Sequence, residues 1–510
     1  MATLLRTSRI LDTSGNRIVY RTAQRGVRAT YDSAQTVTDN VRHWSATDSL
    51  SADAANSPEV RKKLRECARY EVANNGWARA MVDTLAHEVI GTGPRIQIRT
   101  GSKPADEWLE FWYSTWCGLV KLGRKFRTMR KAKCQDGEGI AMFYSNPKLR
   151  GAVQLDIRPI ETDQMATPNV MLAANQIDGI DLDENGNPER YHFLKYHPGG
   201  SDWYGIGEEI LPVPAADEVI HIFREDRPGQ HRGVPEITPA LPIFSRLRRF
   251  TLATLQTAEN IAEMTLMLKT HQPDDGTGAD ISGTTTSDPS SYEAFDVFDI
   301  ERGMISVLPE GTDLFQPDAK QPSSTYVEFV QQCLAEAFAC VCMPYAVGAA
   351  DSSNENFASG KLSRQGFKRA VSVERRLEWD PEFIRVFYAW WSEAKYAMPL
   401  DLRGGIAPES LWRISVFWDG NEDIDPEKAA KARQVMLETG QLGYPTLYAE
   451  MGADYETEQR KQAEALGLSL VDYRKRLANK LLPEAAVAPV SAPNSQGLRN
   501  GETQTSNAIR

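Results

Sequence analysis

The sequence predicts an α+β protein, and three patterns support this prediction. Long segments, most clearly 58–87 and 324–343, repeat their apolar residues with the period of a helix. Between 140 and 224 the pattern changes to short alternating runs separated by Gly, Pro, Asn and Asp, which is typical of strands and hairpins. Two long helical segments then bracket a loop-rich insertion, which indicates an excursion of the chain from a larger body.

The first third of the chain predicts an arm followed by two helices. Residues 1–57 are polar with little periodicity, which suits an extended arm. A helix is predicted at 58–87, with Pro58 in its first turn, and a strand at 95–99. A second helix is predicted at 104–122, where four aromatic residues at helical spacing predict a core face: Trp108, Phe111, Trp112 and Trp116.

The middle of the chain predicts strands and then two long helices. The strands are expected at 153–157, 191–194 and 219–223. A helix at 239–269 could reach about 45 Å at 1.5 Å per residue. The insertion that follows predicts a hairpin of 295–300 against 304–308. The next helix has the spacing of a capping box at Thr325 and Glu328, and it ends at Pro344.

The last third predicts mainly helix. A polar loop at 348–360 precedes a long helix at 361–398, which Asp380-Pro381 interrupts and which buries Phe383, Phe387 and Trp391. A smaller helical region is expected at 425–482. Residues 483–510 are rich in Ala, Pro, Ser and Asn, so we expect a disordered tail.

Composition describes a core-forming globular chain. With 41% apolar and 25% charged residues among 510, a wholly disordered chain and a collagen-like repeat are excluded. The six cysteines are too sparse for a disulfide framework and lack a CxxC spacing, so we expect a reducing compartment. Without a signal peptide or a segment that could span a bilayer, we expect a soluble intracellular protein that has no membrane partner.

Charge is distributed unevenly along the chain. Residues 1–135 hold 23 Lys and Arg against 13 Asp and Glu, a net charge of +10, and the remainder holds 35 against 56, a net charge of −21. The total of −11 argues against a DNA-binding surface, which is usually basic. Seven basic residues and no acid lie between Lys121 and Lys133. A solvated helix face is the favoured interpretation of this run, and contact with phosphates or an acidic partner is the alternative.

Known catalytic and metal-binding patterns are incomplete or absent in this sequence. Residues 181–187 resemble the start of a calcium loop, but the twelfth position is His192 rather than a bidentate carboxylate, so a hairpin turn at Asn185-Gly186 is favoured. A phosphate-binding loop, a zincin motif and a G-x-S-x-G elbow are absent. Cys340 and Cys342 fall on a predicted apolar helix, where buried, inert thiols are expected. We therefore expect no catalytic residue, metal or cofactor, and a structural or binding protein rather than an enzyme.

Four phrases occur in an order and spacing that resemble the lambda-type family of bacteriophage portal proteins. They lie at 69–79, 89–93, 178–193 and 219–234, and the most specific is Arg-Pro-Gly-Gln at 227–230 followed by Arg-Gly-Val. The resemblance covers roughly 40–480. It implies a dodecameric ring at one capsid vertex, through which the terminase large subunit packages double-stranded DNA without sequence specificity. It also implies assembly in the host cytoplasm, a place in the virion, and contacts with major capsid, scaffold and head-tail connector proteins.

The resemblance also implies a portal architecture with an α/β wing, a two-helix stem, a β-rich clip and a helical crown. The corresponding ranges are an arm at 1–40, the wing at 41–235 and 361–420, stem helices at 236–267 and 324–343, the clip at 268–323, a tunnel loop at 344–360, the crown at 421–482 and the tail at 483–510.

DNA that slides through a channel cannot be held tightly, because each Lys or Arg that neutralises a phosphate adds affinity through counterion release. The tunnel loop expected from the resemblance contains Asp351 and Glu355 and no Lys or Arg. The residues expected to face the DNA are Tyr345, Asn354, Asn356, Phe357 and Lys361.

Two other classes of protein are alternatives to a portal. A carbohydrate-active hydrolase could use the 11 tryptophans to stack on sugars and a carboxylate pair for catalysis. Several tryptophans fall inside helical patterns, which favours a core role instead. A terminase motor is disfavoured because the phosphate-binding loop is missing.

Overall fold

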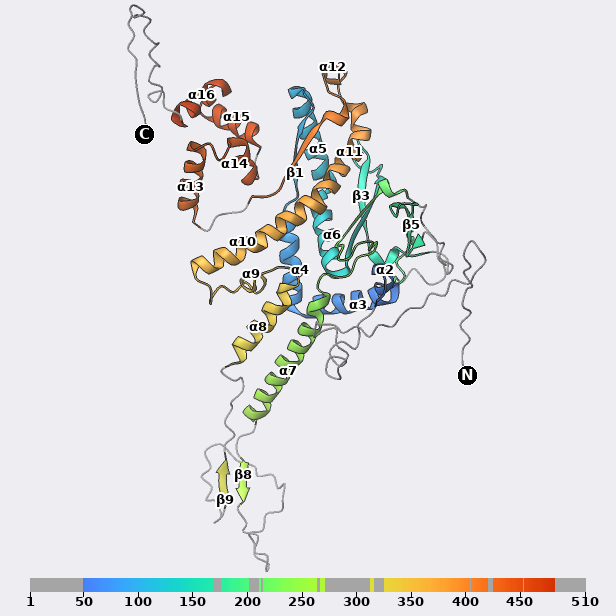
Figure 1. Cartoon of the computed structure of the whole chain (residues 1–510), viewed down its shortest axis with the longest axis vertical. Helices are drawn as coiled ribbons and strands as arrows, with labels where there is room; N and C mark the ends of the chain where they lie inside the picture. The colour runs from blue at the N-terminus through green and yellow to red at the C-terminus, as the bar shows by residue number, and fades with distance from the viewer. Residues whose placement is uncertain are drawn as a thin grey trace, which may run out of the picture. The chain divides into compact units, whose positions relative to one another are not determined.

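The structure is a computed structural model that describes residues 49–167, 176–200, 211, 214–263, 267–270, 312–315, 325–403, 405–420, 425–452 and 454–481. They belong to two compact units, Met1–Ala55 and Asn56–Arg510. The first unit holds the short helix α2 (Ala52–Ala55), and the other elements described below belong to the second unit (Figure 1). The predicted arm at 1–40, hairpin at 295–308 and tail at 483–510 lie outside the described residues.

The predicted helix at 58–87 is two helices. Helix α3 (Pro58–Asn74) begins at the predicted proline, and the Ser57 hydroxyl caps its first turn. Helix α4 (Gly76–Val89) follows at once. Asn75 separates them because its backbone is extended, and its side-chain oxygen accepts a backbone hydrogen bond from the first turn of α4 at 3.0 Å.

Helices α5 (Lys103–Val120) and α6 (Leu122–Asp136) meet at Lys121, which adopts the left-handed conformation. Helix α5 confirms the helix predicted at 104–122, but its aromatic face is only partly core. Trp116 is buried and Trp108 half-buried, whereas Phe111 and Trp112 are exposed. The buried stripe instead passes through Leu109, Tyr113 and Trp116, at i, i+4 and i+7.

Two antiparallel sheets contain the longer strands of the second unit. Strand β2 (Glu138–Ser145) lies between β3 (Leu155–Ile160) and β7 (Val219–Phe223). Strand β7 has its predicted bounds, and β3 begins two residues after the predicted start at 153. Strand β1 (Arg95–Arg99), also as predicted, pairs with β10 (Arg413–Phe417), which brings distant parts of the chain together.

A third small sheet contains β4 (Gln176–Ile177), β5 (Ile180–Leu182) and β6 (Pro188–Tyr191). The strand predicted at 191–194 is wrong beyond Tyr191. Phe193 forms only an isolated bridge with Met165, because the chain there bonds to the turn after β3 rather than to a strand.

The turn predicted at Asn185-Gly186 is confirmed. Gly186 has a φ of +85°, and the Asp183 Oδ1 atom accepts hydrogen bonds from the backbone N–H groups of Asn185 and Asn187 at 2.8 and 2.7 Å. His192, at the twelfth position of the calcium pattern, lies 2.9 Å from Asp181 through its Nε2 atom. The carboxylate of Asp183 therefore closes a hairpin turn.

Helix α7 (Leu241–Glu263) follows a 3₁₀ turn at Thr238–Ala240 and packs beside α8 (Tyr326–Ala339) (Figure 1). The ring of Phe250 on α7 lies 5.3 Å from that of Phe329 on α8. Beyond these helices, β8 (Met267–Thr270) pairs antiparallel with β9 (Thr312–Phe315). The prediction that the first helix continues to Lys269 is wrong, because 267–270 forms this strand.

The capping box predicted at Thr325 and Glu328 is also wrong. Thr325 has a φ of −88° and a ψ of −3°, close to helical, and its side chain makes no capping hydrogen bond. An N-cap side chain reaches the first turn only from an extended backbone.

The predicted long helix at 361–398 is present and starts four residues earlier. Helix α10 (Phe357–Glu374) passes through a π-helical turn at Arg375–Trp379 into α11 (Asp380–Ala397). The irregular turn comes just before Asp380-Pro381, because Pro381 has no N–H to donate and its ring crowds the preceding turn. The predicted burial of Phe383, Phe387 and Trp391 is confirmed. The short helix α12 (Leu400–Arg403) follows.

The helical region predicted at 425–482 is confirmed. It contains α13 (Pro426–Glu438), α14 (Tyr444–Glu450), α15 (Tyr455–Ala465) and α16 (Leu470–Leu481). Helix α15 contacts α5 through ion pairs, including Arg460 to Glu107 at 2.8 Å. None of the described helices combines the length and apolar character needed to cross a membrane.

The main core joins the helices of the first third to α11. At its centre the ring of Tyr113 meets Phe383, Phe387 and Trp390 edge-on, with centroids 5.6, 5.2 and 5.3 Å away. Aromatic pairs in this geometry add to the hydrophobic stabilisation that burial provides. Because these elements share one core, they form a single support from which α8, α9 and α10 extend.

Candidate functional site

The segment 325–374, from α8 to the end of α10, contains all five residues predicted to face DNA. After α8 the chain reverses at Cys342, which has a φ of +56°, and forms the short helix α9 (Tyr345–Gly348). Gly348 lies against Phe338, and an added Cβ would lie only 2.7 Å from that ring. This close approach packs α9 tightly on α8.

The loop predicted at 344–360 is shorter in the structure. Residues 345–348 form α9 and α10 begins at Phe357, so only Pro344 and 349–356 of the predicted loop lie outside helices. Asn356 starts α10 with a reciprocal cap. Its Oδ1 accepts from the Ser359 N–H at 2.8 Å, and its own N–H donates to Ser359 Oγ at 3.0 Å. The sequence analysis missed this start because Ser, rather than the usual Glu or Gln, occupies the third helical position.

Two of the predicted residues shape the coil. The Tyr345 hydroxyl donates to Asp351 Oδ2 at 3.3 Å, and the Asn354 side-chain amide donates to Gln331 Oε1 on α8 at 3.1 Å. These bonds tie the coil to α8 and α9. Each of the two side chains therefore has an intramolecular role that is independent of any ligand.

The other predicted residues lie at the start of α10. Asn356 is its cap, Phe357 is its first residue, and Lys361 is exposed in its second turn. The structure thus gathers the five residues on one continuous stretch, from α9 to the first turns of α10. Contact of these residues with DNA stays a prediction.

Charge changes sign within this stretch. Residues 325–356 contain four acids, Glu328, Glu336, Asp351 and Glu355, and no Lys, Arg or His. The hydrogen bonds that Ser353 donates lower the pKa of Asp351, so this carboxylate is charged at neutral pH. Residues 357–373 contain four cations and no acid. The segment therefore offers charged and hydrogen-bonding groups to a partner.

The thiols near this segment show no sign of activation. All six cysteines are free. Burial raises the pKa of Cys340 to about 11, which keeps the thiol protonated and poorly nucleophilic. The predicted burial of Cys342 is wrong: it is exposed because α8 ends at Ala339 and the chain then turns.

The predicted basic run at 121–133 is not a uniform solvated face. Arg130 is 2% and Lys133 1% exposed. Arg130 Nη1 lies 2.8 Å from Glu236 Oε2 and its Nε 2.7 Å from Glu374 Oε1, while Lys133 pairs with Glu236, Glu374 and Glu378. Neither solvation nor phosphate contact applies to these two residues. They instead join α6 to the residues before α7 and to the π-helical turn.

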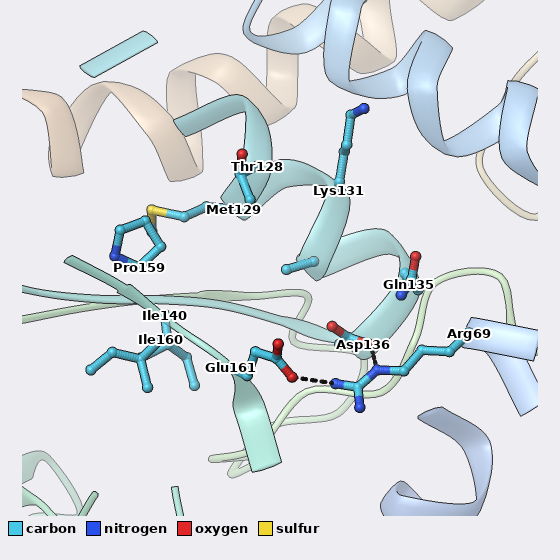
Figure 2. A pocket seen from close by; sticks show the side chains of 11 residues that line it. Arg69, Thr128, Met129, Lys131, Gln135, Asp136, Ile140, Pro159, Ile160 and Glu161 are labelled. Atoms are coloured by element: carbon cyan, nitrogen blue, oxygen red, sulfur yellow. Dashed lines mark hydrogen bonds and ion pairs between the residues drawn. The ribbon is translucent and has the colours of Figure 1, made fainter. Parts of the chain in front are cut away.

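A pocket of about 570 Å³ lies beside α6. Its apolar wall includes Met129, Ile140 and Ile160 (Figure 2). Arg69 reaches between two carboxylates there. Its Nε donates to Asp136 Oδ1 at 2.7 Å, and its Nη2 lies 3.7 Å from Glu161 Oε2. The charged groups of the pocket neutralise one another, so they do not form an acid and base poised for catalysis.

Glu161, Asp163 and His197 have ligand atoms within 4.8 Å of one another, as in a metal site. However, Arg65 Nη2 lies 2.7 Å from Asp163 Oδ1 and Arg69 Nη1 lies 2.6 Å from Asp163 Oδ2. Burial raises the pKa of Asp163, but the two arginines more than offset this and lower it overall. Guanidinium groups thus occupy the oxygens a metal would need, and the cluster fits an ion-pair network better than a metal site.

Comparison with protein families decides what kind of protein carries these features. The model of a family described as phage portal protein, lambda family, matches residues 39–375, more than half of the chain. The chain belongs to the lambda family of phage portal proteins. Membership indicates a structural role, and it leaves the carbohydrate-active hydrolase without support.

Three solved structures that are similar to this portal protein come from gene transfer agent (GTA) particles. They are the virion of the native particle (16% identity, 76% of this chain and 93% of that chain, TM-score 0.41), the neck of the native particle computed with C12 symmetry (14%, 78% and 94%, 0.42) and the neck of the empty particle computed with C6 symmetry (13%, 76% and 92%, 0.43). No curated protein matches the chain.

The most specific phrase of this portal protein has a structural role that the sequence analysis missed. Arg232 is buried and forms a two-pronged ion pair with Glu138, with N–O distances of 2.7 and 2.9 Å. The Gln230 side chain donates to the Arg232 carbonyl oxygen at 2.8 Å. An added Cβ on Gly233 would lie 2.2 Å from the Gly137 carbonyl oxygen, so glycine is required there. The sequence contains both dipeptides, Gly137-Glu138 and Arg232-Gly233, but it does not show that they meet in the fold.

The tryptophans of this portal protein mostly serve the core. Of the seven tryptophans in the predicted helices, Trp116, Trp379, Trp390 and Trp391 are buried, as a core role predicts, Trp108 is half-buried, and Trp77 and Trp112 are exposed. A sugar-binding platform would require several exposed indole rings on loops. The exposed Trp112 lies on α5 beside the exposed Phe111, at a ring distance of 5.4 Å.

Proposed function

We propose that this portal protein forms a closed, dodecameric ring at one vertex of a capsid, through which a terminase motor moves double-stranded DNA. The observation that carries the proposal is the family match over residues 39–375. A ring subunit needs two different faces that complement each other, because the contact between neighbours is head-to-tail. The described surface offers candidates for such faces.

Exposed apolar residues on α7 and α8 support association. Helix α7 exposes Phe250, Leu252 and Leu255, and α8 exposes Val327 and Phe329. Adjacent large apolar side chains on a surface usually mark an interaction site. We assign 236–267 and 324–343 to a stem whose helices pack against those of neighbouring copies and line the channel.

The segment 344–360 would face the DNA in that channel. Asp351 and Glu355 and the lack of cations between 344 and 356 suit a surface along which DNA slides, since phosphates gain no counterion-release energy there. Tyr345, Asn354, Asn356 and Phe357 would make polar or steric contact. Lys361 is the nearest cation, and DNA contact would be independent of sequence.

The remaining parts would serve assembly. We assign 268–323 to a clip that meets the terminase large subunit and a head-tail connector. We assign 41–235 together with 361–420 to a wing that meets major capsid and scaffold proteins. Residues 421–482 would form a crown. The protein would assemble in the host cytoplasm and remain in the virion.

The test is the assembly state of the purified full-length chain. Native mass spectrometry and negative-stain images should show a closed ring of about twelve subunits. A chain that remains monomeric at micromolar concentration would contradict the proposal. Deletion of 275–292 should leave the ring intact and impair terminase docking or DNA packaging, and normal packaging by this variant would contradict the clip assignment.

A further inference from the structure

A row of cations on α10 has no partner within the described part of the chain. Lys361, Arg364 and Lys368 stand at i, i+3 and i+7, which places them on one side of the helix, here named the basic face. Their side chains are exposed or half-exposed. Among the described residues, none of the ion pairs involves them, and α10 itself contains no acid before Glu374. The basic face is thus available to a partner outside the subunit.

Helix α8 presents the opposite charge. Glu328 and Glu336 are exposed, and in the part of the chain that the structure describes neither forms an ion pair; together they are named the acidic face. At 1.5 Å per residue, the two glutamates stand roughly 12 Å apart along α8, and Lys361 and Lys368 stand roughly 10 Å apart along α10. Two helices laid side by side could therefore form two ion pairs at once.

The subunit cannot satisfy these charges by itself. Helix α10 packs on α4 and buries Phe367 and Val371, whereas Lys361 and Arg364 stay exposed. Helix α9 packs on α4 and α8, and the described residues hold no ion pair between α8 and α10. The two faces are close in sequence, yet each is left open in a single copy.

Apolar residues beside the charges favour a protein partner over DNA. Leu362, beside Lys361 on α10, is 72% exposed, and Leu377, in the π-helical turn that follows α10, is 70% exposed. Val327 and Phe329 are exposed beside the acidic face. Phosphates would leave these apolar side chains in water, whereas a protein interface covers apolar and charged groups together. Cations that gripped phosphates would also oppose the sliding of DNA.

We infer that the basic face of α10 in one copy docks on the acidic face of α8 in the next copy. This is a head-to-tail contact that repeats around the ring, and it rests on the proposed function. The occupant of each face is a second copy of this chain, so in this arrangement Lys361 pairs with that copy, and Tyr345, Asn354, Asn356 and Phe357 are the residues left to face the DNA. The complementary charges select the neighbour and its register, and the leucines and Phe329 are covered when it docks.

Charge reversal tests the contact. One variant, R364E/K368E, makes the α10 face acidic, and a second, E328K/E336K, makes the α8 face basic. Each variant alone should lose the ring, because like charges face each other at every contact, with association weakened roughly tenfold or more per interface. An equimolar mixture should recover rings in which the two variants alternate, since every contact again joins opposite charges. Native mass spectrometry distinguishes the three samples by mass.

The matched control is K475E/R476E on α16, which changes the same number of charges at exposed positions and should retain the ring. Near-UV circular dichroism of all variants should match wild type, because the altered side chains are exposed or half-exposed. If the wild-type chain forms no ring, the proposed function fails, and this inference with it.

A different set of results overturns the inference alone. They are a wild-type ring that persists in both variants, a mixture that shows no recovery, or a control that loses the ring as the variants do. Fluorescence anisotropy with a double-stranded oligonucleotide tests whether the basic face binds DNA instead of a neighbouring copy. An R364E/K368E ring that is intact but binds DNA more weakly would assign the basic face to DNA instead.

Discussion

Replacement of Arg232 by Met should be among the most destabilising single changes in this portal protein. Arg232 is 1% exposed and holds Glu138, which is also 1% exposed, through two hydrogen bonds. Its Nη1 atom lies 2.8 Å from Asp178 Oδ2 as well. In the variant, Glu138 would keep the Gly233 N–H at 2.7 Å and His221, whose Nε2 lies 3.4 Å away. A buried carboxylate would then lack its main countercharge.

The size of the effect follows from this geometry. Removal of one partner from a buried ion pair costs about 3–5 kcal/mol, because the remaining charge stays desolvated. Asp178 adds little to this cost, since it also pairs with Arg61. The double variant E138M/R232M should lose much less, since replacement of both charges by apolar groups is often nearly neutral. The pair therefore provides its own control.

Urea unfolding, followed by tryptophan fluorescence, measures the difference in free energy of unfolding between wild type and each variant. The protomer concentrations must be equal, because ring association also contributes to stability. Burial raises the pKa of Glu138, but Arg232 and the His221 hydrogen bond more than offset this and hold it well below 4.5. The wild-type advantage should thus be complete above that value and narrow as the pH falls through the folded-state pKa. A loss under about 1 kcal/mol in R232M, or a double variant as unstable as R232M, would refute the reasoning.

Three further changes test the fold around the candidate site and the junction with the C-terminal helices. N356A removes the cap of α10 and should cost about 0.5–2 kcal/mol, seen as faster amide exchange at the start of α10 and unchanged exchange in α11. G348A places a Cβ 2.7 Å from the buried Phe338 ring and should cost about 1–3 kcal/mol in urea unfolding, so a neutral result would contradict the packing of α9 on α8. Burial raises the pKa of Glu110 from 4.5 to about 7, so wild-type stability should fall between these two values, where the unfolded state has lost this proton and the folded state still holds it, and should level off above pH 7. E110Q should remove that decline and gain about 1–3 kcal/mol at pH 8, and an unchanged pH profile would contradict it.

Local patterns predicted the positions of most elements. Strands β1 and β7 and helix α5 fall where alternation or helical spacing indicated, because apolar periodicity reports which side of an element is buried. Boundaries failed where one residue overrides the pattern. Asn75 divides a continuous apolar stripe, and Asn356 starts α10 inside a predicted loop. In both places a side-chain cap competes with the periodicity.

The candidate site was predicted as a stretch of chain but not as a geometry. Tyr345, Asn354 and Asn356 were chosen as polar loop residues, and the structure gives each an intramolecular partner. The separation of the charges of α8 and α10 onto two open faces also requires the structure. Sequence shows that acids precede cations, whereas exposure and the lack of partners depend on how α9 and α4 pack.

Family membership and the sequence of helices and strands follow from local chemistry along the chain, in ordered phrases such as 219–234 and in apolar periodicity. Whether each charged side chain is buried or exposed does not follow from this local chemistry. Arg130 and Lys133 belong to a run of basic residues that suggested a solvated face, yet they are buried against Glu236, Glu374 and Glu378. A charged side chain is stable inside a protein only beside an opposite charge, and these partners, distant in sequence, meet only when α6, the residues before α7, the end of α10 and the π-helical turn pack together.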